Sequence, residues 1–307
     1  MSYPVLIHKY TDLLTAIEFS SQSAPEHFLV FVGGLGDGFL TVPYVPALAQ
    51  QVAARLPHCA VVQALISSSY LGFGTGSLAR DAAELAQLVR FLRTHRGTSR
   101  SRVILMGHST GCQDTMEYLS KYSQRADFDA VEALDGAILQ APVSDSEAFR
   151  HFASDQVDEL LALAKSHLEN GRPDELLPAR ALDVVFGAPI LAARFVALAD
   201  RRGADDYFSL YLTAEDHAQT FGRVRVPLLV LEGGADEFVP PHVDRADLVR
   251  LWQKATPPEF WSARSKVVPG ALHNAGETSA PGAQDDVVRT AVDFVADVLG
   301  GESARAE

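Results

Sequence analysis

Cysteine is scarce in this sequence, and long apolar runs are absent. Only two cysteines, Cys59 and Cys112, occur among 307 residues, which excludes a disulfide-stapled scaffold and predicts free thiols in a reducing compartment. No run reaches the roughly 18 apolar residues of a membrane span, and the N-terminus, MSYPVLIHKYTDLL, lacks the regions of a signal peptide. We therefore expect a cytoplasmic protein.

Basic residues are fewer than acidic residues in this sequence. The 26 lysines and arginines are outnumbered by 39 aspartates and glutamates, which gives a formal net charge of −13. Nucleic acids and anionic membranes bind basic surfaces, so we expect neither as a partner. The acidity fits a soluble enzyme that takes a neutral or cationic small molecule.

Signatures of metal and nucleotide binding are also missing. Histidines and acids do not fall at H-E-x-x-H or comparable spacing, so we expect no metal site. Two glycine-rich stretches, GGLGDG (33–38) and GFGTGS (72–77), match neither the P-loop nor the dinucleotide-binding pattern. We therefore expect no cofactor.

Apolar patterning indicates an α/β fold. Short β-branched runs alternate with longer helical patterns, which is typical of a mainly parallel sheet flanked by helices, and 47% hydrophobic residues suffice for its core. Strands are expected at 28–34, 60–66, 102–107, 136–142, 227–234 and 265–270. Helices are expected at 44–56, 77–95, 110–123, 241–254 and 283–299.

One region interrupts this alternation. Residues 146–222 contain helical patterns such as SDQVDELLALAKSHLE but no strand pattern, and they exceed what one crossover connection needs. We expect a helical lid insertion at 146–222 between two parts of the core, 1–145 and 223–307. The alternative is that part of the region covers the sheet like an ordinary crossover helix.

A serine flanked by glycines follows the apolar run 103–106. Gly107, Ser109 and Gly111 fit G-x-S-x-G, in which a sharp strand-to-helix turn exposes the serine hydroxyl. Glycine at both flanks removes the Cβ atoms that would collide in such a turn. The pattern is short enough to arise by accident, so its context must decide.

That context is an acid and a histidine in the right order. In α/β hydrolases the nucleophile, acid and histidine follow one another along the chain, each after a strand. Asp236 follows the strand expected at 227–234, and His273 follows the last expected strand. We therefore predict Ser109 as nucleophile, Asp236 as acid and His273 as base.

Some alternatives remain. An aspartate in a turn after a strand is common for conformational reasons alone, and Glu237 or Glu232 could serve as the acid instead. His242 also follows Asp236, but it lies where a helix is starting.

Backbone N–H groups are expected to bind the developing oxyanion. One should come from Thr110, the residue after the nucleophile, and one from Leu35 in the loop after the strand at 28–34. Gly34 in that loop lets the backbone approach the substrate closely. Four aromatic residues are predicted to line the substrate cleft, although aromatic side chains often belong to the core instead: Tyr70, Phe73, Tyr207 and Tyr211.

Five segments resemble one fungal branch of the α/β-hydrolase superfamily, the family that includes siderophore esterases acting on fusarinine-type compounds. They are VGGLGDGFLTVPYVPALA (32–49), SSSYLGFGTGSLARDAAEL (67–85), MGHSTGCQDTMEYL (106–119), GADDYFSLYLTAED (203–216) and PLLVLEGGADEFVP (227–240). The resemblance spans nearly the whole chain. It implies an α/β-hydrolase fold with Ser109, Asp236 and His273 in the roles predicted above.

The resemblance also implies a substrate. A relative of this family would hydrolyse ester bonds in ferric hydroxamate siderophores and so release iron inside the cell, with the iron carried by the substrate. Four acidic residues of the expected lid could bind amines of such a substrate, or could simply cap helices: Asp205, Asp206, Glu215 and Asp216.

The sequence leaves other functions open. A general carboxylesterase, an amidase or a deacetylase could use the same three residues, because leaving-group preference depends on pocket shape. A non-catalytic ligand-binding protein could also retain this fold.

Overall fold

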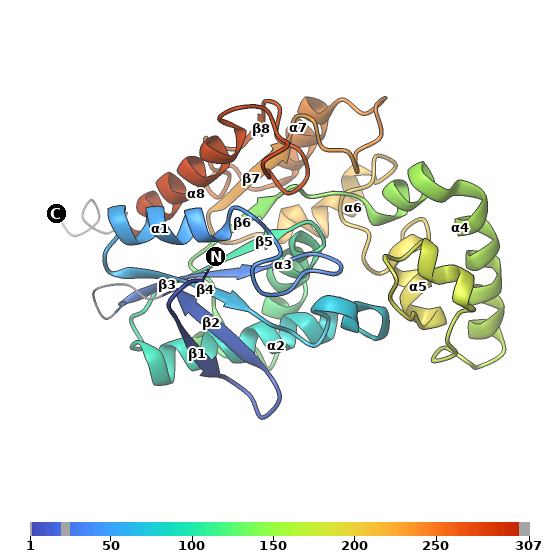
Figure 1. The fold of residues 1–307 in the computed structure, drawn as a ribbon, viewed down its shortest axis with the longest axis horizontal. Coiled ribbons are helices and arrows are strands. Elements are labelled where there is room, and N and C mark those ends of the chain that lie inside the picture. Colours follow the sequence, from blue (N-terminus) through green and yellow to red (C-terminus); the bar gives the residue numbers. More distant parts are fainter. Residues whose placement is uncertain (1, 20–24, 301–307) are drawn as a thin grey trace.

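An eight-stranded sheet forms the centre of the computed structural model, which describes residues 2–19 and 25–300 (Figure 1). The strands are β1 (Val5–Lys9), β2 (Thr15–Phe19), β3 (His27–Val32), β4 (Cys59–Ala64), β5 (Val103–His108), β6 (Gly136–Gln140), β7 (Leu228–Gly233) and β8 (Lys266–Val268). The α-helices are α1 (Val45–Arg55), α2 (Leu78–Phe91), α3 (Gly111–Ser120), α4 (Asp145–Glu169), α5 (Ala192–Ala199), α6 (Ala214–Ala218), α7 (Arg245–Ala255) and α8 (Ala283–Gly300). A π turn, Leu92–Arg96, extends α2.

The strand order brings two loops together at one edge of the sheet. The order is β1-β2-β4-β3-β5-β6-β7-β8; β3 to β8 are parallel, and β1 and β2 pair antiparallel at one end. The chain order reverses at β3, so the loops after β3 and β5 leave side by side, with Val32 paired to Gly107. Such a switch point is where open α/β sheets bind ligands.

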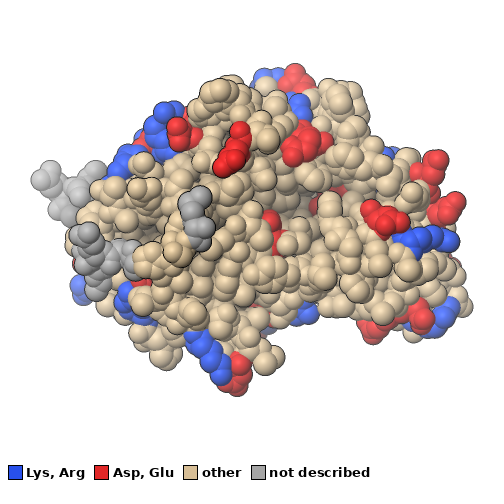
Figure 2. Space-filling model, viewed as in Figure 1, with Lys and Arg blue, Asp and Glu red and all other residues tan. Residues whose placement is uncertain are grey.

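The outer surface carries scattered charge. On the face shown in Figure 2, acidic and basic side chains form small groups around the rim, and the middle is mainly uncharged. Within residues 2–19 and 25–300, no helix is both long and apolar enough to cross a membrane.

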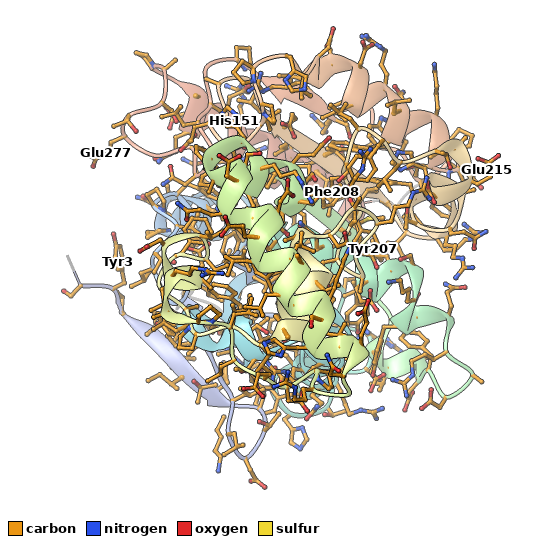
Figure 3. All side chains as sticks on the ribbon, turned by 90° about the vertical axis from the view of Figure 1, so that its right-hand side faces the viewer. Tyr3, His151, Tyr207, Phe208, Glu215 and Glu277 are labelled. Atoms are coloured by element: carbon orange, nitrogen blue, oxygen red, sulfur yellow. The ribbon has the colours of Figure 1, made fainter. Side chains whose placement is uncertain are left out.

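Residues 146–222 form a helical region beside the sheet. Between Gln140, where β6 ends, and Leu228, where β7 begins, the chain adds no strand to the sheet. Helix α4 bends at Ala153, whose φ of −149° and ψ of 44° are not helical, and it packs against α5 around a separate hydrophobic cluster. When the right-hand side of Figure 1 faces the viewer, as in Figure 3, α4 runs across the front of the molecule with His151 near one end. A lid role for this region stays a prediction.

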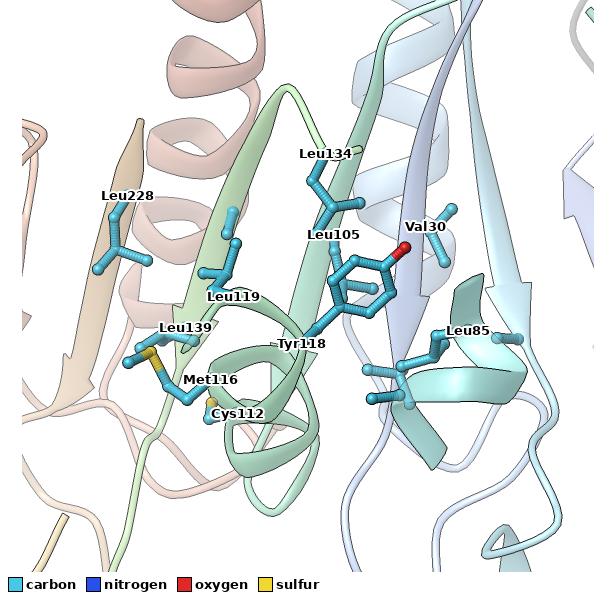
Figure 4. Close-up of a cluster of buried hydrophobic side chains, with 14 of the residues drawn as sticks. Val30, Leu85, Leu105, Cys112, Met116, Tyr118, Leu119, Leu134, Leu139 and Leu228 are labelled. Carbon is cyan, nitrogen blue, oxygen red and sulfur yellow. The ribbon is translucent and has the colours of Figure 1, made fainter. Parts of the chain in front are cut away.

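Alternate strand residues build two hydrophobic layers. In β5, Leu105 faces the layer that contains α2 and α3, whereas Ile104 and Met106 face the layer that contains α1 and α8. Figure 4 shows the first layer, where Met116 and Leu119 of α3 lie against the strands. Every residue of α3 is buried, so the helix that begins just after Ser109 is held on all sides.

Two departures from the expected elements have local causes. The antiparallel strands β1 and β2 were not expected, because His8 and Glu18 interrupt their apolar patterns; the structure pairs these two side chains with each other, and Arg96 binds Glu18. Helix α7 begins at Arg245, four residues later than expected, because the Asp244 side chain caps it.

A buried arginine, Arg194, ties the helical region to the core. Arg194 of α5 donates to the carboxylate of Asp205 and to the backbone oxygen of Phe73, and both charged residues are only 4% exposed. Burial raises the pKa of Asp205, and the positive charge of Arg194 counteracts that rise. Burial also raises the pKa values of Asp81 and Asp114, and the positive charge of Arg194 opposes those rises as well.

Replacing Arg194 should therefore be strongly destabilising. An Arg194→Met variant leaves the carboxyl of Asp205 buried without its partner, which should reduce the free energy of unfolding by about 3–5 kcal/mol in urea denaturation. The matched control is Arg125→Met, which breaks an exposed pair with Asp127 and should change stability far less. Equal effects of the two substitutions would show that Arg194 does not anchor this region.

Candidate active site

Ser109 occupies a strained turn between β5 and α3. Its φ of +54° lies in the left-handed region, which a serine adopts only under constraint. A Cβ atom on Gly107 would lie 2.1 Å from the backbone oxygen of Gly111, and one on Gly111 would lie 2.5 Å from that of Val32. Both glycines of the sequence pattern are thus required by close backbone approach.

The structure brings Ser109, His273 and Asp236 together. His273 Nε2 lies 2.7 Å from Ser109 Oγ, and His273 Nδ1 lies 2.7 Å from Asp236 Oδ2. An ionised carboxylate can only accept, so Nδ1 carries the proton and Nε2 is free to accept from the serine hydroxyl. This geometry allows the imidazole to take the hydroxyl proton during nucleophilic attack.

Neighbouring groups hold the acid and the imidazole in place. Asp236 is 1% exposed, and its Oδ1 accepts from the backbone N–H of Phe238 at 2.9 Å. The Phe238 ring packs against the His273 ring with 4.5 Å between centroids. These contacts restrict the imidazole to the orientation that faces Ser109.

The alternative acids and base have other surroundings. Glu237 accepts from the backbone N–H of His273 at 3.0 Å and contacts the main chain of that residue. Glu232 is fully buried in β7, and neither carboxyl oxygen has a hydrogen-bond partner among the described residues. Burial raises the pKa of Glu232 well above its ordinary value. His242 lies in the turn before α7.

Two backbone N–H groups near Ser109 have no hydrogen-bond acceptor in the described part of the chain. No acceptor within residues 2–19 and 25–300 binds the N–H of Leu35 or of Thr110. The N–H of Gly34, in contrast, donates to Asp37 Oδ2 at 2.8 Å. Gly34 lies directly against the serine, because a Cβ atom there would be 2.5 Å from Ser109 Cβ. The loop after β3 can therefore bring the Leu35 N–H close to Ser109 only because residue 34 is a glycine.

A cavity of about 300 Å³ opens above Ser109 and His273. Its volume is at the low end of the usual range for small-molecule sites. The helical region supplies much of its apolar wall, and Phe152 and Phe186 remain 59% and 52% exposed. The residues of this wall are Ala148, Phe149, Phe152, Ala153, Val184 and Phe186.

The polar part of the cavity wall is acidic. Asp37, Asp145 and Asp183 line it, and its lining includes no lysine or arginine among the described residues. Burial raises the pKa of Asp145 to about 7, and Gln113 donates to this carboxyl at 2.8 Å. The cavity therefore favours neutral or cationic groups over anions.

The four aromatic residues expected in the cleft lie outside this cavity. Phe73 is buried within the hydrophobic cluster of the helical region, and the Tyr70 hydroxyl accepts from the N–H of Phe39 at 3.0 Å. The Tyr207 hydroxyl donates to Glu117 of α3 at 2.6 Å, and the Tyr211 hydroxyl donates to Asp206.

The aromatic residues that do line the cavity were missed. They are Phe149, Phe152, Phe186 and Phe238. The sequence offered two signals: Phe149 and Phe152 share a helix face at a spacing of three residues, and Phe238 comes two residues after Asp236.

The acidic residues of the expected lid have partners of their own. Asp205 pairs with Arg194, Asp206 accepts from Tyr211 and Ser209, and Asp216 caps its own helix. Glu215 lies at the outer edge of the molecule (Figure 3). The capping alternative thus accounts for Asp216.

Comparison with known proteins places the chain in a family. The family described as "Protein of unknown function (DUF1749)" matches residues 1–296. Fusarinine C esterase sidJ of Aspergillus fumigatus is 32% identical, and the match covers 88% of this chain and 89% of that protein.

Solved structures show the same fold. Siderophore hydrolase EstB from Aspergillus fumigatus superposes with a TM-score of 0.84 at 30% identity, covering 97% of this chain and 98% of that one. An alpha/beta hydrolase fold protein of unknown function reaches a TM-score of 0.67 at 17% identity, covering 100% and 98%. The chain therefore belongs to the DUF1749 family and is an α/β hydrolase of the fungal siderophore esterase-like type.

Proposed function

We propose that this protein is a serine esterase in which Ser109 is the nucleophile, His273 the general base and Asp236 the residue that orients the imidazole. The observation that carries the proposal is the continuous hydrogen-bond chain from Asp236 through His273 to Ser109, which opens into the cavity. A serine hydroxyl is a poor nucleophile unless a base of this kind takes its proton.

The reaction runs in two acyl transfers. Ser109 Oγ attacks the ester carbonyl carbon while His273 Nε2 takes its proton, and the N–H groups of Leu35 and Thr110 bind the oxyanion. His273 then gives the proton to the leaving alcohol as the carbon–oxygen bond breaks, which leaves an acyl group on Ser109. Water attacks this acyl-enzyme with the same assistance and releases the carboxylic acid.

The apolar wall suits an apolar part of the substrate. We propose that residues 146–222 act as a lid, because Phe149, Phe152 and Phe186 face the cavity across from Ser109. An apolar segment of the substrate between these rings would exclude water from the reacting carbonyl, while the exposed edges of Phe152 and Phe186 leave room for a bulky group at the rim.

The proposed substrates are ester-linked hydroxamate siderophores, with cleavage releasing their iron inside the cell. Support comes from similarity over nearly the whole chain to proteins named fusarinine C esterase and siderophore hydrolase. The iron belongs to the substrate in this scheme, and the chemistry at Ser109 is ester hydrolysis alone.

Substitution of the three residues tests the proposal. Ser109→Ala should reduce hydrolysis of p-nitrophenyl butyrate by about 10⁶-fold, and Asp236→Asn by about 10⁴-fold, because an amide there favours the wrong imidazole tautomer. The matched control is Glu232→Gln, which changes a buried carboxyl outside this hydrogen-bond chain and should leave kcat/KM within about twofold. Full activity of Ser109→Ala would contradict the mechanism.

The same preparations test the substrate. Wild type should also release hydroxamic acid monomers from a ferric fusarinine-type ester, as measured by liquid chromatography, and Ser109→Ala should not. Hydrolysis of the nitrophenyl ester without hydrolysis of the siderophore would contradict the proposed substrate class but not the proposed esterase activity.

The close approach of Gly34 to Ser109 generates a further prediction. In Gly34→Ala the new methyl group would meet Ser109 Cβ at 2.5 Å, so the loop or the nucleophile must shift. A displacement of about 1 Å should lower kcat about 100-fold. The control is Gly222→Ala, whose methyl group would meet nothing closer than 3.6 Å and should leave kcat unchanged. Equal kcat values in both variants would show that Gly34 does not set this geometry.

A further inference from the structure

His108, the residue before the nucleophile, has no part in the mechanism above. It is 3% exposed, yet it lines the cavity, and its ring centroid lies 5.0 Å from that of His273. A buried imidazole on the wall of an active site has two ring nitrogens whose protonation decides what it can bind.

The network behind His108 fixes its tautomer. Gln140 Nε2 donates to the backbone oxygen of His273 at 3.2 Å, and because a carbonyl can only accept, the amide NH₂ must face it. Gln140 Oε1 therefore faces the other way, where it accepts from the Tyr44 hydroxyl at 2.9 Å and contacts His108 Nδ1 at 2.6 Å. The proton of neutral His108 thus lies on Nδ1.

His108 Nε2 is consequently an acceptor on the cavity side. Burial lowers the pKa of His108 to about 4, so the ring is neutral near pH 7 and Nε2 carries a lone pair. No donor among the described residues binds this atom. Its neighbour is Asp37 Oδ2 at 3.9 Å, and this carboxylate oxygen is an acceptor as well.

Two acceptors therefore converge on one part of the cavity wall. Asp37 Oδ2 already accepts from the Gly34 N–H, and Asp37 Oδ1 accepts from the Thr41 hydroxyl at 2.7 Å, which holds the carboxylate in position. Acceptors that lie close together in a partly desolvated site are unfavourable until a donor satisfies them. A hydroxyl or ammonium group could donate to both.

We propose that His108 Nε2 and Asp37 Oδ2 form a subsite that binds a hydrogen-bond donor of the substrate, a hydroxyl or ammonium group carried close to the scissile ester. The proposal rests on the esterase function above. Because the His108 ring lies 5.0 Å from that of His273 in the same cavity, the donor must lie within a few bonds of the ester carbonyl. Asp183 also lines the cavity, and this carboxylate adds to the preference for an ammonium group.

Matched substrates test the subsite. Wild type is assayed with p-nitrophenyl esters whose acyl chains have equal length and end in ammonium, hydroxyl or methyl: 3-aminopropanoyl, 3-hydroxypropanoyl and butanoyl, and the series one carbon longer. Each kcat/KM is divided by the uncatalysed hydrolysis rate of that ester. At least one donor-bearing ester should exceed its methyl counterpart by about tenfold, the contribution of one hydrogen bond. Preference for either donor supports the subsite.

Two variants assign that preference to the proposed atoms. In Asp37→Asn, the amide oxygen can keep the Gly34 contact while the NH₂ takes the place of Oδ1 and donates to the Thr41 hydroxyl. The subsite then loses the carboxylate charge, so the donor preference should fall. In His108→Asn, the amide NH₂ can replace the Nδ1–H contact to Gln140 while the Nε2 acceptor is lost, with the same result. Thermal unfolding checks that each variant is folded.

The outcomes separate this proposal from the esterase function. If wild type hydrolyses all esters with equal normalised kcat/KM, the subsite is wrong and the esterase stands. A wild-type preference that persists in both variants also overturns the subsite, because the donor then binds elsewhere, such as at Asp145. If wild type hydrolyses none of the esters, both proposals fail together.

Discussion

The hydrogen bond between His273 Nε2 and Ser109 Oγ is the contact on which the rest of the site depends. It joins atoms 164 residues apart in the chain, and each is delivered by a different strand end. The buried α3 fixes the serine, and Asp236 together with the Phe238 ring fixes the imidazole. Loss of either support would separate the nucleophile from its base without changing the sheet.

A second constraint lies beneath this contact. The side chain of Gln140, at the end of β6, connects the backbone of His273 with Tyr44 and His108 through buried hydrogen bonds. Buried polar groups are costly unless every member is paired, so this network fixes positions sharply. The orientation of His108 on the cavity wall and the backbone position of the base are therefore held by the same side chain.

The sequence predicts the reacting groups better than the pocket around them. Ser109, Asp236 and His273 can be placed from their order, because the carboxyl ends of parallel strands share one edge of the sheet. The pocket depends on a bend at Ala153 and a left-handed backbone at Phe186, neither of which a periodic pattern encodes. Tyr207 is a further example, because its hydrogen bond to Glu117 holds the side chain outside the cavity, and the sequence does not show that contact.

Reaction with a fluorophosphonate probe, followed by peptide mass spectrometry, tests the central contact most directly. Such a probe modifies a serine only where a neighbouring base activates it and oxyanion donors receive the phosphoryl oxygen. One phosphonyl group per chain, located on the peptide that contains Ser109 and missing from His273→Ala, is the expected result. Absence of labelling in the folded wild type, or labelling at another serine, would contradict an activated Ser109.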